Sequence, residues 1–430
     1  MKVEIRNGRI IDPASALDRN ASVFIADGRI VSVGDNAPSG FRAEGVLDAA
    51  GCIVCPGLID LAARLREPGF EYLATLESEM AAAAAGGVTR LVCPPDTDPP
   101  LDEPGLVEML RRRASHPCFA HVHPVGALTV ALAGARLTEM AELAEAGCIA
   151  FGQANVAIVD TQVLMRAMQY AATFRLPVWM QACDAHLGRS GVAHDGAVAA
   201  RLGLPGVSVL AETVALATLL QLARETGVRL HVQRLSSARG LQMFRAARSE
   251  GLDVSCDVSI NHLHLSEEDI GYFDTLTRLD PPLRTLADRD ALAAGLAAGD
   301  IDVLCSDHTP VNEDARLEPF ETAQAGATGL ELLLPLTLAW AERVGAPLPQ
   351  ALARITCDPA RVLGLAESGR IAVGAAADIC VFDPQAKFIV SPQRLKSQGK
   401  NTPFLGRELH GEVRYTLIDG NLAHAADRLL

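Results

Sequence analysis

The sequence predicts an α/β fold, a TIM-type (β/α)8 barrel joined to a small β-sandwich domain that is assembled from both termini. Short β-type runs separated by turn signals fill the first fifty residues and return near the end of the chain. Between them, Ala/Leu-rich helical segments alternate with short apolar strands over about 300 residues, a pattern typical of a closed parallel barrel. No G-x-G-x-x-G motif follows a strand, which disfavours a dinucleotide-binding fold.

The β-type elements at the two ends of the chain predict one small domain. Asn7-Gly8 and Asp27-Gly28 each lie between β-branched residues, which is a hairpin signal. Similar short runs return at 377–382 and 415–420. We therefore assign residues 1–54 plus 366–430 to the β domain.

The barrel is predicted to span 55–365, and one helix–strand unit in it is clear. Residues 76–85 predict a helix, Gly86-Gly87 end it, and 88–93 predict the next strand. Further barrel strands are expected at 147–151, 176–180, 228–232, 252–256 and 301–305.

Composition excludes several classes of partner. The formal net charge of −14 argues against binding to nucleic acid or to an anionic membrane. No apolar run reaches the roughly 18–20 residues of a membrane span, and the first residues do not begin a signal peptide. The ten cysteines are scattered without a C-x-x-C pair, which is typical of reduced thiols in a cytoplasmic protein.

Four segments at expected strand ends carry the most specific pattern. They are 56–69 (P-G-L-I-D-L-A-A-R-L-R-E-P-G), 94–100 (P-P-D-T-D-P-P), 280–284 (D-P-P-L-R) and 306–310 (S-D-H-T-P). The set resembles dihydroorotases of the amidohydrolase superfamily, whose segments read P-G-x-I-D-x-H-x-H-x-R-E-P-G, M-P-N-T-x-P, N-P-P-L-R and D-H-A-P. The resemblance extends along the whole chain and implies the amidohydrolase barrel.

The resemblance also implies where catalytic metals would be bound. The family's reaction needs a metal-bound hydroxide and a Lewis acid that polarises the amide carbonyl. A methyl group cannot ligate a metal, and a guanidinium repels a cation and has no free lone pair. The chain retains one of these family positions, Asp307, and has lost the others: Ala62, Arg64, Gln153, Gln181 and Arg234. We therefore expect no catalytic residues, no metal and no other cofactor.

Lysine is also missing from the barrel, where the family often uses a carboxylated lysine as a ligand. The four lysines are Lys2, Lys387, Lys396 and Lys400, so none lies inside the barrel. Because a buried unpaired carboxylate is costly, Arg64 and Arg234 are expected to pair with Asp307 and to replace the metals electrostatically.

The substrate side of the site is mixed. By resemblance Arg66 would hold the carboxylate of dihydroorotate, although a purely structural role is an equal alternative. Asp96 stands where the family has an asparagine, and its charge would oppose that carboxylate. His262 and His308 complete the substrate-like pocket that the resemblance implies.

Four further histidines are considered as possible site residues. His121-Val122-His123 is an H-x-H motif on a predicted strand, but its context resembles a family strand whose histidine is not a ligand. His186 and His194 are expected in a solvent-facing connection.

A dihydroorotase-like chain without metal ligands resembles the inactive subunits that some bacteria pair with aspartate transcarbamoylase. This implies a non-catalytic structural subunit of pyrimidine biosynthesis, in a hetero-oligomer with the aspartate transcarbamoylase catalytic chain. One alternative is an active dihydroorotase, or a related cyclic amidohydrolase, that holds zinc through unusual ligands. Another is a sensor that binds a pyrimidine intermediate without turnover.

Overall fold

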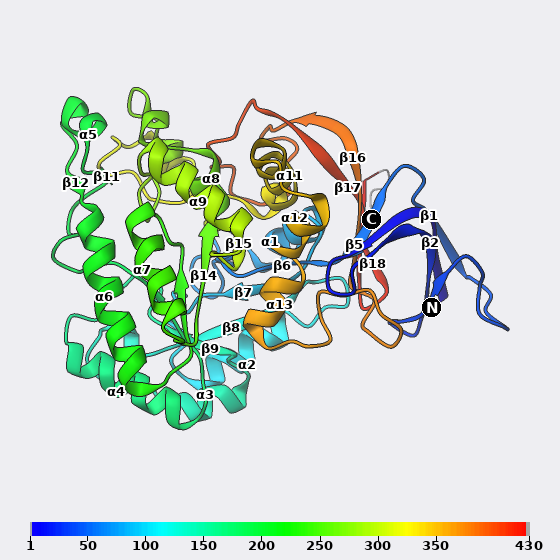
Figure 1. Ribbon diagram of the computed structural model, residues 1–430, viewed down its shortest axis with the longest axis horizontal. Helices are drawn as coiled ribbons and strands as arrows, with labels where there is room; N and C mark the ends of the chain where they lie inside the picture. Colours follow the sequence, from blue (N-terminus) through cyan, green and yellow to red (C-terminus); the bar gives the residue numbers. More distant parts are fainter. Residues whose placement is uncertain (1, 427–430) are drawn as a thin grey trace.

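The computed structural model describes residues 2–426, which form two units packed side by side. In Figure 1 the barrel lies on the left, with its helices around the outside, and a smaller sheet lies on the right beside both termini. The predicted architecture, a (β/α)8 barrel with a terminal β domain, is confirmed.

The barrel wall consists of eight parallel strands whose order in space follows their order along the chain. Each strand predicted in this region overlaps an observed one, and α1 and β7 have the predicted bounds. The strands are β6 (Leu58–Asp60), β7 (Val88–Cys93), β8 (His121–Ala127), β9 (Ala150–Gly152), β10 (Val178–Gln181), β13 (Leu230–Gln233), β14 (Val254–Ser259) and β15 (Val303–Cys305).

Helices cover the outside of this wall and bury apolar residues against it. The first of them shows how the sequence sets a boundary: Thr75 caps it by accepting a hydrogen bond from the Ser78 backbone, and Gly86 ends it. The main covering helices are α1 (Leu76–Ala85), α2 (Pro104–Arg113), α3 (Met140–Ala146), α4 (Thr161–Thr173), α6 (Val209–Thr226), α7 (Ala238–Ser249), α9 (Leu286–Ala298) and α11 (Leu333–Val344). The shorter ones are α5 (Ala197–Leu202), α8 (Ile260–His264), α10 (Asp314–Leu317), α12 (Leu348–Ala353) and α13 (Cys357–Leu363).

The barrel closes just beyond the ends of β6 and β15. The His308 N–H donates to the Ala62 carbonyl (2.9 Å), and the Arg64 N–H donates to the His308 carbonyl (2.9 Å). Asp60, at the end of β6, reinforces the closure by accepting the Ser306 N–H (2.8 Å). These contacts place the residues after β6 beside those after β15, at the mouth of the barrel.

The terminal domain is a single hydrogen-bonded sheet that draws on both ends of the chain, rather than two separate sheets. Its own core is made of alternating Val and Ile side chains. The strands are β1 (Lys2–Asp12), β2 (Leu17–Ala26), β3 (Arg29–Gly34), β4 (Gly45–Asp48), β5 (Ile53–Pro56), β16 (Ile379–Ile389), β17 (Glu408–Ile418) and β18 (Asn421–Ala425). The domain's N-terminal part ends at Pro56, two residues after the predicted boundary.

One of the two hairpin predictions is wrong. Asp27-Gly28 forms the turn between β2 and β3, with positive φ at both residues. Asn7-Gly8 lies instead inside β1, at a bulge in its pairing with β2. A side chain at Gly8 would meet Val54 of β5 at 2.5 Å, so this glycine serves a close approach of strands.

The C-terminal segment also touches the barrel. The Asn401 side chain donates to the carbonyls of Thr309 (3.0 Å) and Gly326 (2.9 Å), close to the barrel mouth. The loop between β16 and β17 is therefore fixed to the face where the site residues gather.

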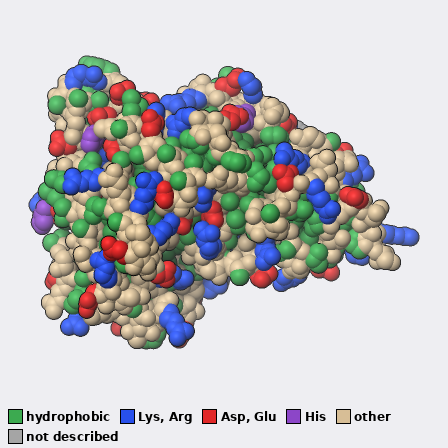
Figure 2. Space-filling model, in the orientation of Figure 1, with side chains coloured by type: hydrophobic (Ala, Val, Ile, Leu, Met, Phe, Trp, Pro, Cys, Tyr) green, Lys and Arg blue, Asp and Glu red, His purple; other side chains and the backbone are tan. Residues whose placement is uncertain are grey.

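The visible surface in Figure 2 carries basic and acidic side chains interspersed with apolar ones, without a continuous basic stripe. Within residues 2–426, no helix is both long and apolar enough to cross a membrane.

Candidate functional site

The mouth of the barrel brings together polar side chains from the ends of most strands. Arg64 follows β6, Asp96 follows β7, Arg234 follows β13 and Asp307 follows β15. Such strand ends carry the active site in barrels of this type. The structure thus gathers four of the residues that the sequence singled out.

The centre of the group is an ion pair between Arg234 and Asp307, both buried. Arg234 Nη1 lies 3.2 Å from Asp307 Oδ1, and Arg64 Nη1 lies 4.0 Å from the same oxygen. The pairing of Asp307 with arginine that the sequence predicts is therefore present in the structure. The Arg234 contact is a hydrogen-bonded pair, and the Arg64 contact is longer.

Arg64 has a closer carboxylate partner on its other side. Its Nε donates to Asp96 Oδ2 (2.7 Å), Nη1 donates to Thr309 Oγ1 (3.1 Å) and Nη2 donates to Asn155 Oδ1 (2.8 Å). The charge of Asp96 is therefore balanced by Arg64, which reduces its repulsion of a substrate carboxylate.

Two residues that the sequence reasoning missed complete the network, Asn155 and Asp280. Asn155 Oδ1 also accepts from Arg234 Nη2 (2.6 Å), so one amide oxygen bridges both arginines. Asn155 Nδ2 donates to Asp280 Oδ2 (2.8 Å), and Gln181 Nε2 donates to Asp280 Oδ1 (3.2 Å). The signal that could have identified Asp280 was its place in D-P-P-L-R, where the family has asparagine.

The backbone holds the paired residues in uncommon conformations. Arg66, Arg234 and Asp307 have φ values of 63°, 51° and 52°, in the left-handed region that side chains other than glycine rarely adopt. Arg234 is fixed there because its N–H donates to Asp257 Oδ1 (2.7 Å) on β14. Neighbouring strands thus impose the direction of these side chains.

The pKa values of the aspartates at the mouth are set by two opposing effects, burial, which raises them, and pairing with arginine, which lowers them. Burial raises the pKa of Asp307, and the guanidinium groups of Arg234 and Arg64 offset only part of that effect. Burial acts the same way on Asp96, but Arg64 and Arg66 outweigh it and hold the pKa of Asp96 below its usual value. Burial and the adjacent Arg64 lower the pKa of Arg66 to about 10.

A cavity of about 170 Å³ remains at the mouth, beside this network. Arg66 lines it together with Arg64 and Asp96, and the Arg66 Nε donates to the Pro310 carbonyl (3.0 Å). Arg66 therefore combines the two roles considered for it, contact with the barrel backbone and exposure to a pocket.

Several predicted site positions do not face the cavities of the mouth. Gln153 is turned away, and its Nε2 donates to Thr129 Oγ1 (2.7 Å) and the Leu132 carbonyl (2.9 Å). His262 is buried beneath the Pro282 carbonyl, 3.2 Å from its Nε2. His308 lies 2.5 Å from Glu79 on α1, where the two form a buried pair. Neither His262 nor His308 lines the two cavities at the mouth that contain Arg64 or Arg234, because each ring is bonded to another part of the barrel.

The residues at the mouth do not fit a catalytic metal. Ala62 presents only a methyl group, and the places of two imidazoles are taken by guanidinium groups that bond to Asp96, Asn155 and Asp307. Among residues 2–426, the one group of three His, Cys, Asp or Glu side chains close enough to share an ion lies elsewhere, and none occurs at the mouth. Three arginines face three aspartates at the mouth, so its charge is already balanced.

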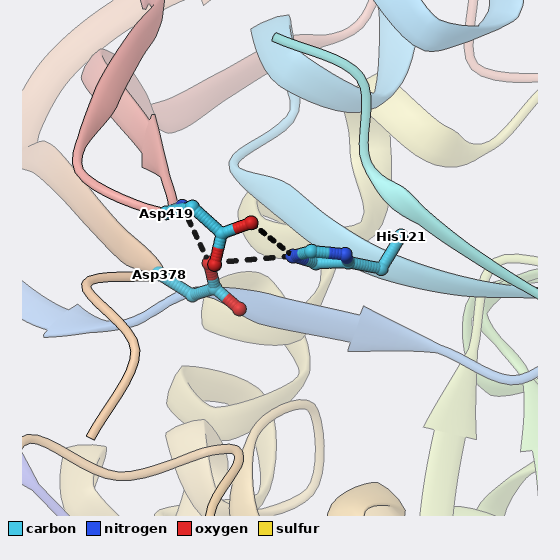
Figure 3. A group of neighbouring side chains, drawn as sticks. All are labelled: His121, Asp378 and Asp419. Atoms are coloured by element: carbon cyan, nitrogen blue, oxygen red, sulfur yellow. Dashed lines mark hydrogen bonds and ion pairs between the residues drawn. The ribbon is translucent and has the colours of Figure 1, made fainter. Parts of the chain in front are cut away.

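The His-x-His segment lies at the opposite end of the barrel, where β8 begins. His121 Nε2 is 3.3 Å from Asp419 Oδ2 and 3.7 Å from Asp378 Oδ1, and both aspartates belong to the terminal domain (Figure 3). Arg90 donates to the other oxygen of Asp378 (2.8 Å). His123 is not part of this group, and burial lowers its pKa to about 3. Arg90 and a protonated His121 balance the two carboxylates, so the cluster is an ionic contact between the domains.

This contact predicts a pH dependence of stability. The carboxylates of Asp378 and Asp419 raise the pKa of His121 to about 9. Its stabilising contribution is therefore complete below the unfolded value of about 6.5 and is lost as the pH rises through about 9. The melting temperatures of wild type and His121→Gln should differ most near pH 6 and converge by about pH 10.

The matched control for this prediction is His186→Gln, because His186 is exposed and lies far from the domain contact. Its difference from wild type should not change with pH. A wild-type advantage over His121→Gln that grows towards pH 10 would contradict the assignment.

His194 also departs from its prediction. It was expected to face solvent, but it is buried on β11 (Ala193–His194), and its Nδ1 lies 3.3 Å from Arg284 Nη1. His186 is exposed, as expected. The difference arises because β11 pairs with β12 (Gly206–Val207) over this part of the mouth.

Solved structures share this fold along the whole chain. The L-hydantoinase (dihydropyrimidinase) from Arthrobacter aurescens matches 100% of this chain and 97% of its own, with a TM-score of 0.88 and 23% identity. The dihydropyrimidinase from Brevibacillus agri matches 100% of this chain and 96% of its own, with a TM-score of 0.84 and 22% identity. Barrel, terminal sheet and the place of the site together define an amidohydrolase fold.

Sequence comparison identifies the family within this fold. Residues 51–239 match the family described as dihydro-orotase-like, and residues 207–424 match the amidohydrolase family. A dihydroorotase-like protein from Pseudomonas aeruginosa is 44% identical over 99% of this chain and 100% of its own. A dihydroorotase from Syntrophotalea carbinolica is 38% identical over 99% of each chain. The chain belongs to the dihydroorotase-like members of the amidohydrolase superfamily.

Proposed function

We propose that this chain is a non-catalytic dihydroorotase-like protein of pyrimidine biosynthesis, acting in the cytoplasm as a structural subunit. One observation carries the proposal: the metal positions are filled by a bonded network in which Arg234 and Arg64 surround Asp307. A guanidinium in place of an imidazole excludes a cation from the same space by charge and by volume. In this proposal the barrel has a structural role only, and we call it the frame.

We further propose that the frame supports assembly of the aspartate transcarbamoylase catalytic chain in a hetero-oligomer. This partner comes from the sequence resemblance to inactive subunits that accompany that enzyme. A stable complex of this kind would bury roughly 1,200–2,000 Å² or more at each interface, enough to survive gel filtration.

Co-expression with the aspartate transcarbamoylase chain of the same genome tests the assembly role. The two chains should elute together from a size-exclusion column at a mass above either alone, measured by light scattering. The control is each chain expressed separately and mixed with an unrelated barrel protein. Independent migration of the two chains would remove the assembly role.

An active cyclic amidohydrolase is the second candidate, since several relatives that match nearly the whole chain are named dihydroorotases. It would require zinc held by ligands other than the family's. A sensor of pyrimidine intermediates is the third, and the cavity beside Arg66 is the observation in its favour. Metal content separates the second candidate from the other two.

A further inference from the structure

The outward face of helix α6 carries no charged side chain between Val209 and Ala223. Glu212 is the one charged residue in that stretch, and it is buried where the backbones of Ser236 and Ser237 donate to its carboxylate. Other covering helices, α2, α3 and α7, each expose at least two charged side chains: Arg111, Arg112, Glu142, Glu145, Arg239 and Arg245. Because the solvent face of a helix is ordinarily polar or charged, α6 departs from the pattern of this wall.

Exposed apolar side chains gather around α6 from three segments. Leu210 and Val214 lie one turn apart on the helix and are 47% and 42% exposed, while Val159 (62%) precedes α4 and Leu187 (44%) lies in the loop after β10. The same three segments border one small hollow of about 100 Å³. We call these four residues and the hollow the apolar face. A contiguous apolar surface of this kind on a soluble protein typically marks an interaction site.

The surface around the apolar face is large enough for a stable interface, because α4 packs beside α6. The helices have 13 and 18 residues, so at about 1.5 Å per residue and about 10 Å of width each they present roughly 500 Å². With the adjoining loops this approaches the ~800 Å² that each partner buries in a stable complex. Figure 1 shows both helices on the side of the barrel away from the terminal sheet.

Charges of both signs border the apolar face. Asp160 precedes α4 and Arg166 lies on it, while Asp184 and Arg189 lie in the loop after β10. None of these four side chains forms an ion pair within residues 2–426: the two aspartates accept backbone N–H groups, and Arg166 donates to the Gln169 amide oxygen. Both signs are therefore available for pairing with a partner surface that carries both signs.

We propose that two copies of this chain associate through the apolar face, related by a two-fold axis. Each copy has a formal net charge of −14, so two copies repel each other except where the contact surface lacks like charges. A two-fold contact brings the same patch onto itself and so requires a patch that complements itself. The apolar face has both the protruding side chains and the hollow that can receive one, and its border has both signs of charge.

The mass of the full-length protein, purified alone, tests the proposal by analytical ultracentrifugation over a range of micromolar concentrations. Wild type should sediment as a dimer. Val214→Glu should weaken the association by at least about a hundredfold, because the two-fold axis places an unpaired carboxylate in the buried contact from each copy. Val214 is exposed in the single chain, so its replacement should leave the barrel folded.

Two further variants make the result specific. Leu187→Glu adds the same charge from a loop instead of from α6, and it should also weaken the dimer. Val373→Glu is the matched control, because Val373 is 69% exposed and lies in a turn of the terminal domain, outside the apolar face. It should dimerise as wild type does.

Two outcomes would overturn the proposal: a wild-type chain that stays monomeric, and a dimer that Val214→Glu and Leu187→Glu leave unchanged. If the monomeric chain binds aspartate transcarbamoylase and Val214→Glu abolishes that binding, the apolar face belongs to that partner and not to a second copy. The dimer goes beyond the proposed scaffold role and does not depend on it. A wild-type dimer that does not co-elute with the partner chain would remove the assembly role alone.

Discussion

Replacing Asp307 with asparagine should lower the free energy of unfolding by about 3–5 kcal/mol, the usual cost of breaking a buried ion pair. Asp307 is the carboxylate that pairs with Arg234, and without it a guanidinium that is only 4% exposed would keep its charge unbalanced. Arg64 would be less affected, because Asp96 lies 2.7 Å from its Nε. Urea unfolding followed by tryptophan fluorescence measures the effect, since Trp179 and Trp340 are both buried in the barrel.

Two controls show whether the loss comes from the buried charge. Asp18→Asn breaks the exposed Arg9–Asp18 pair (2.7 Å) and should cost less than about 1 kcal/mol. The double variant Arg234→Met with Asp307→Leu removes both charges, and it should be more stable than Asp307→Asn alone. An Asp307→Asn protein as stable as wild type would show that the network does not hold the mouth together.

Protein purified from cells grown with added zinc should contain well below one equivalent of zinc per chain, measured by inductively coupled plasma mass spectrometry. The reason is that Arg64 and Arg234 stand where the resemblance places imidazole ligands, while Ala62 offers no donor. Treatment with a chelator should accordingly leave the melting temperature unchanged. Hydrolysis of dihydroorotate should stay at the background rate.

His121→Asn is the control for metal bound at the wrong place. His121, Asp378 and Asp419 form the one group of metal-binding atoms among residues 2–426, and it lies at the domain contact. If zinc is found in wild type but not in His121→Asn, the metal is bound at the domain contact, and the conclusion that the mouth binds no metal still holds. Stoichiometric zinc that survives this substitution would establish the metalloenzyme alternative.

Local sequence signals predicted the regular elements of the fold well. A run of helix-forming residues with a Thr75 cap and a Gly86 stop defines α1 to the residue. The hairpin predicted at Asn7-Gly8 is wrong, because a dipeptide of this type can form a turn or, as here, allow the close approach of another strand. What decides between them is the presence of Val54 from β5, a contact that a local sequence window does not contain.

The sequence identified both arginines of the candidate site but not the amide that bridges them. Arg64 and Arg234 follow strands whose neighbours fix them, and both reach Asp307 as expected. Gln153 was expected at the centre, yet Asn155 lies there. The reason is the left-handed backbone of Ala154 (φ 50°), which turns the chain as it leaves β9, so that alternation along a strand no longer applies.

Because the terminal sheet is built from both ends of the chain, the terminal domain can fold completely only late in translation. β5 ends at Pro56, but β16, which pairs with it, begins only at Ile379. At roughly 5–20 residues per second, a ribosome needs tens of seconds to cover that interval. During this time β1 and β5 have emerged without their C-terminal neighbours, and a complete terminal domain can form only on chains translated nearly to their end.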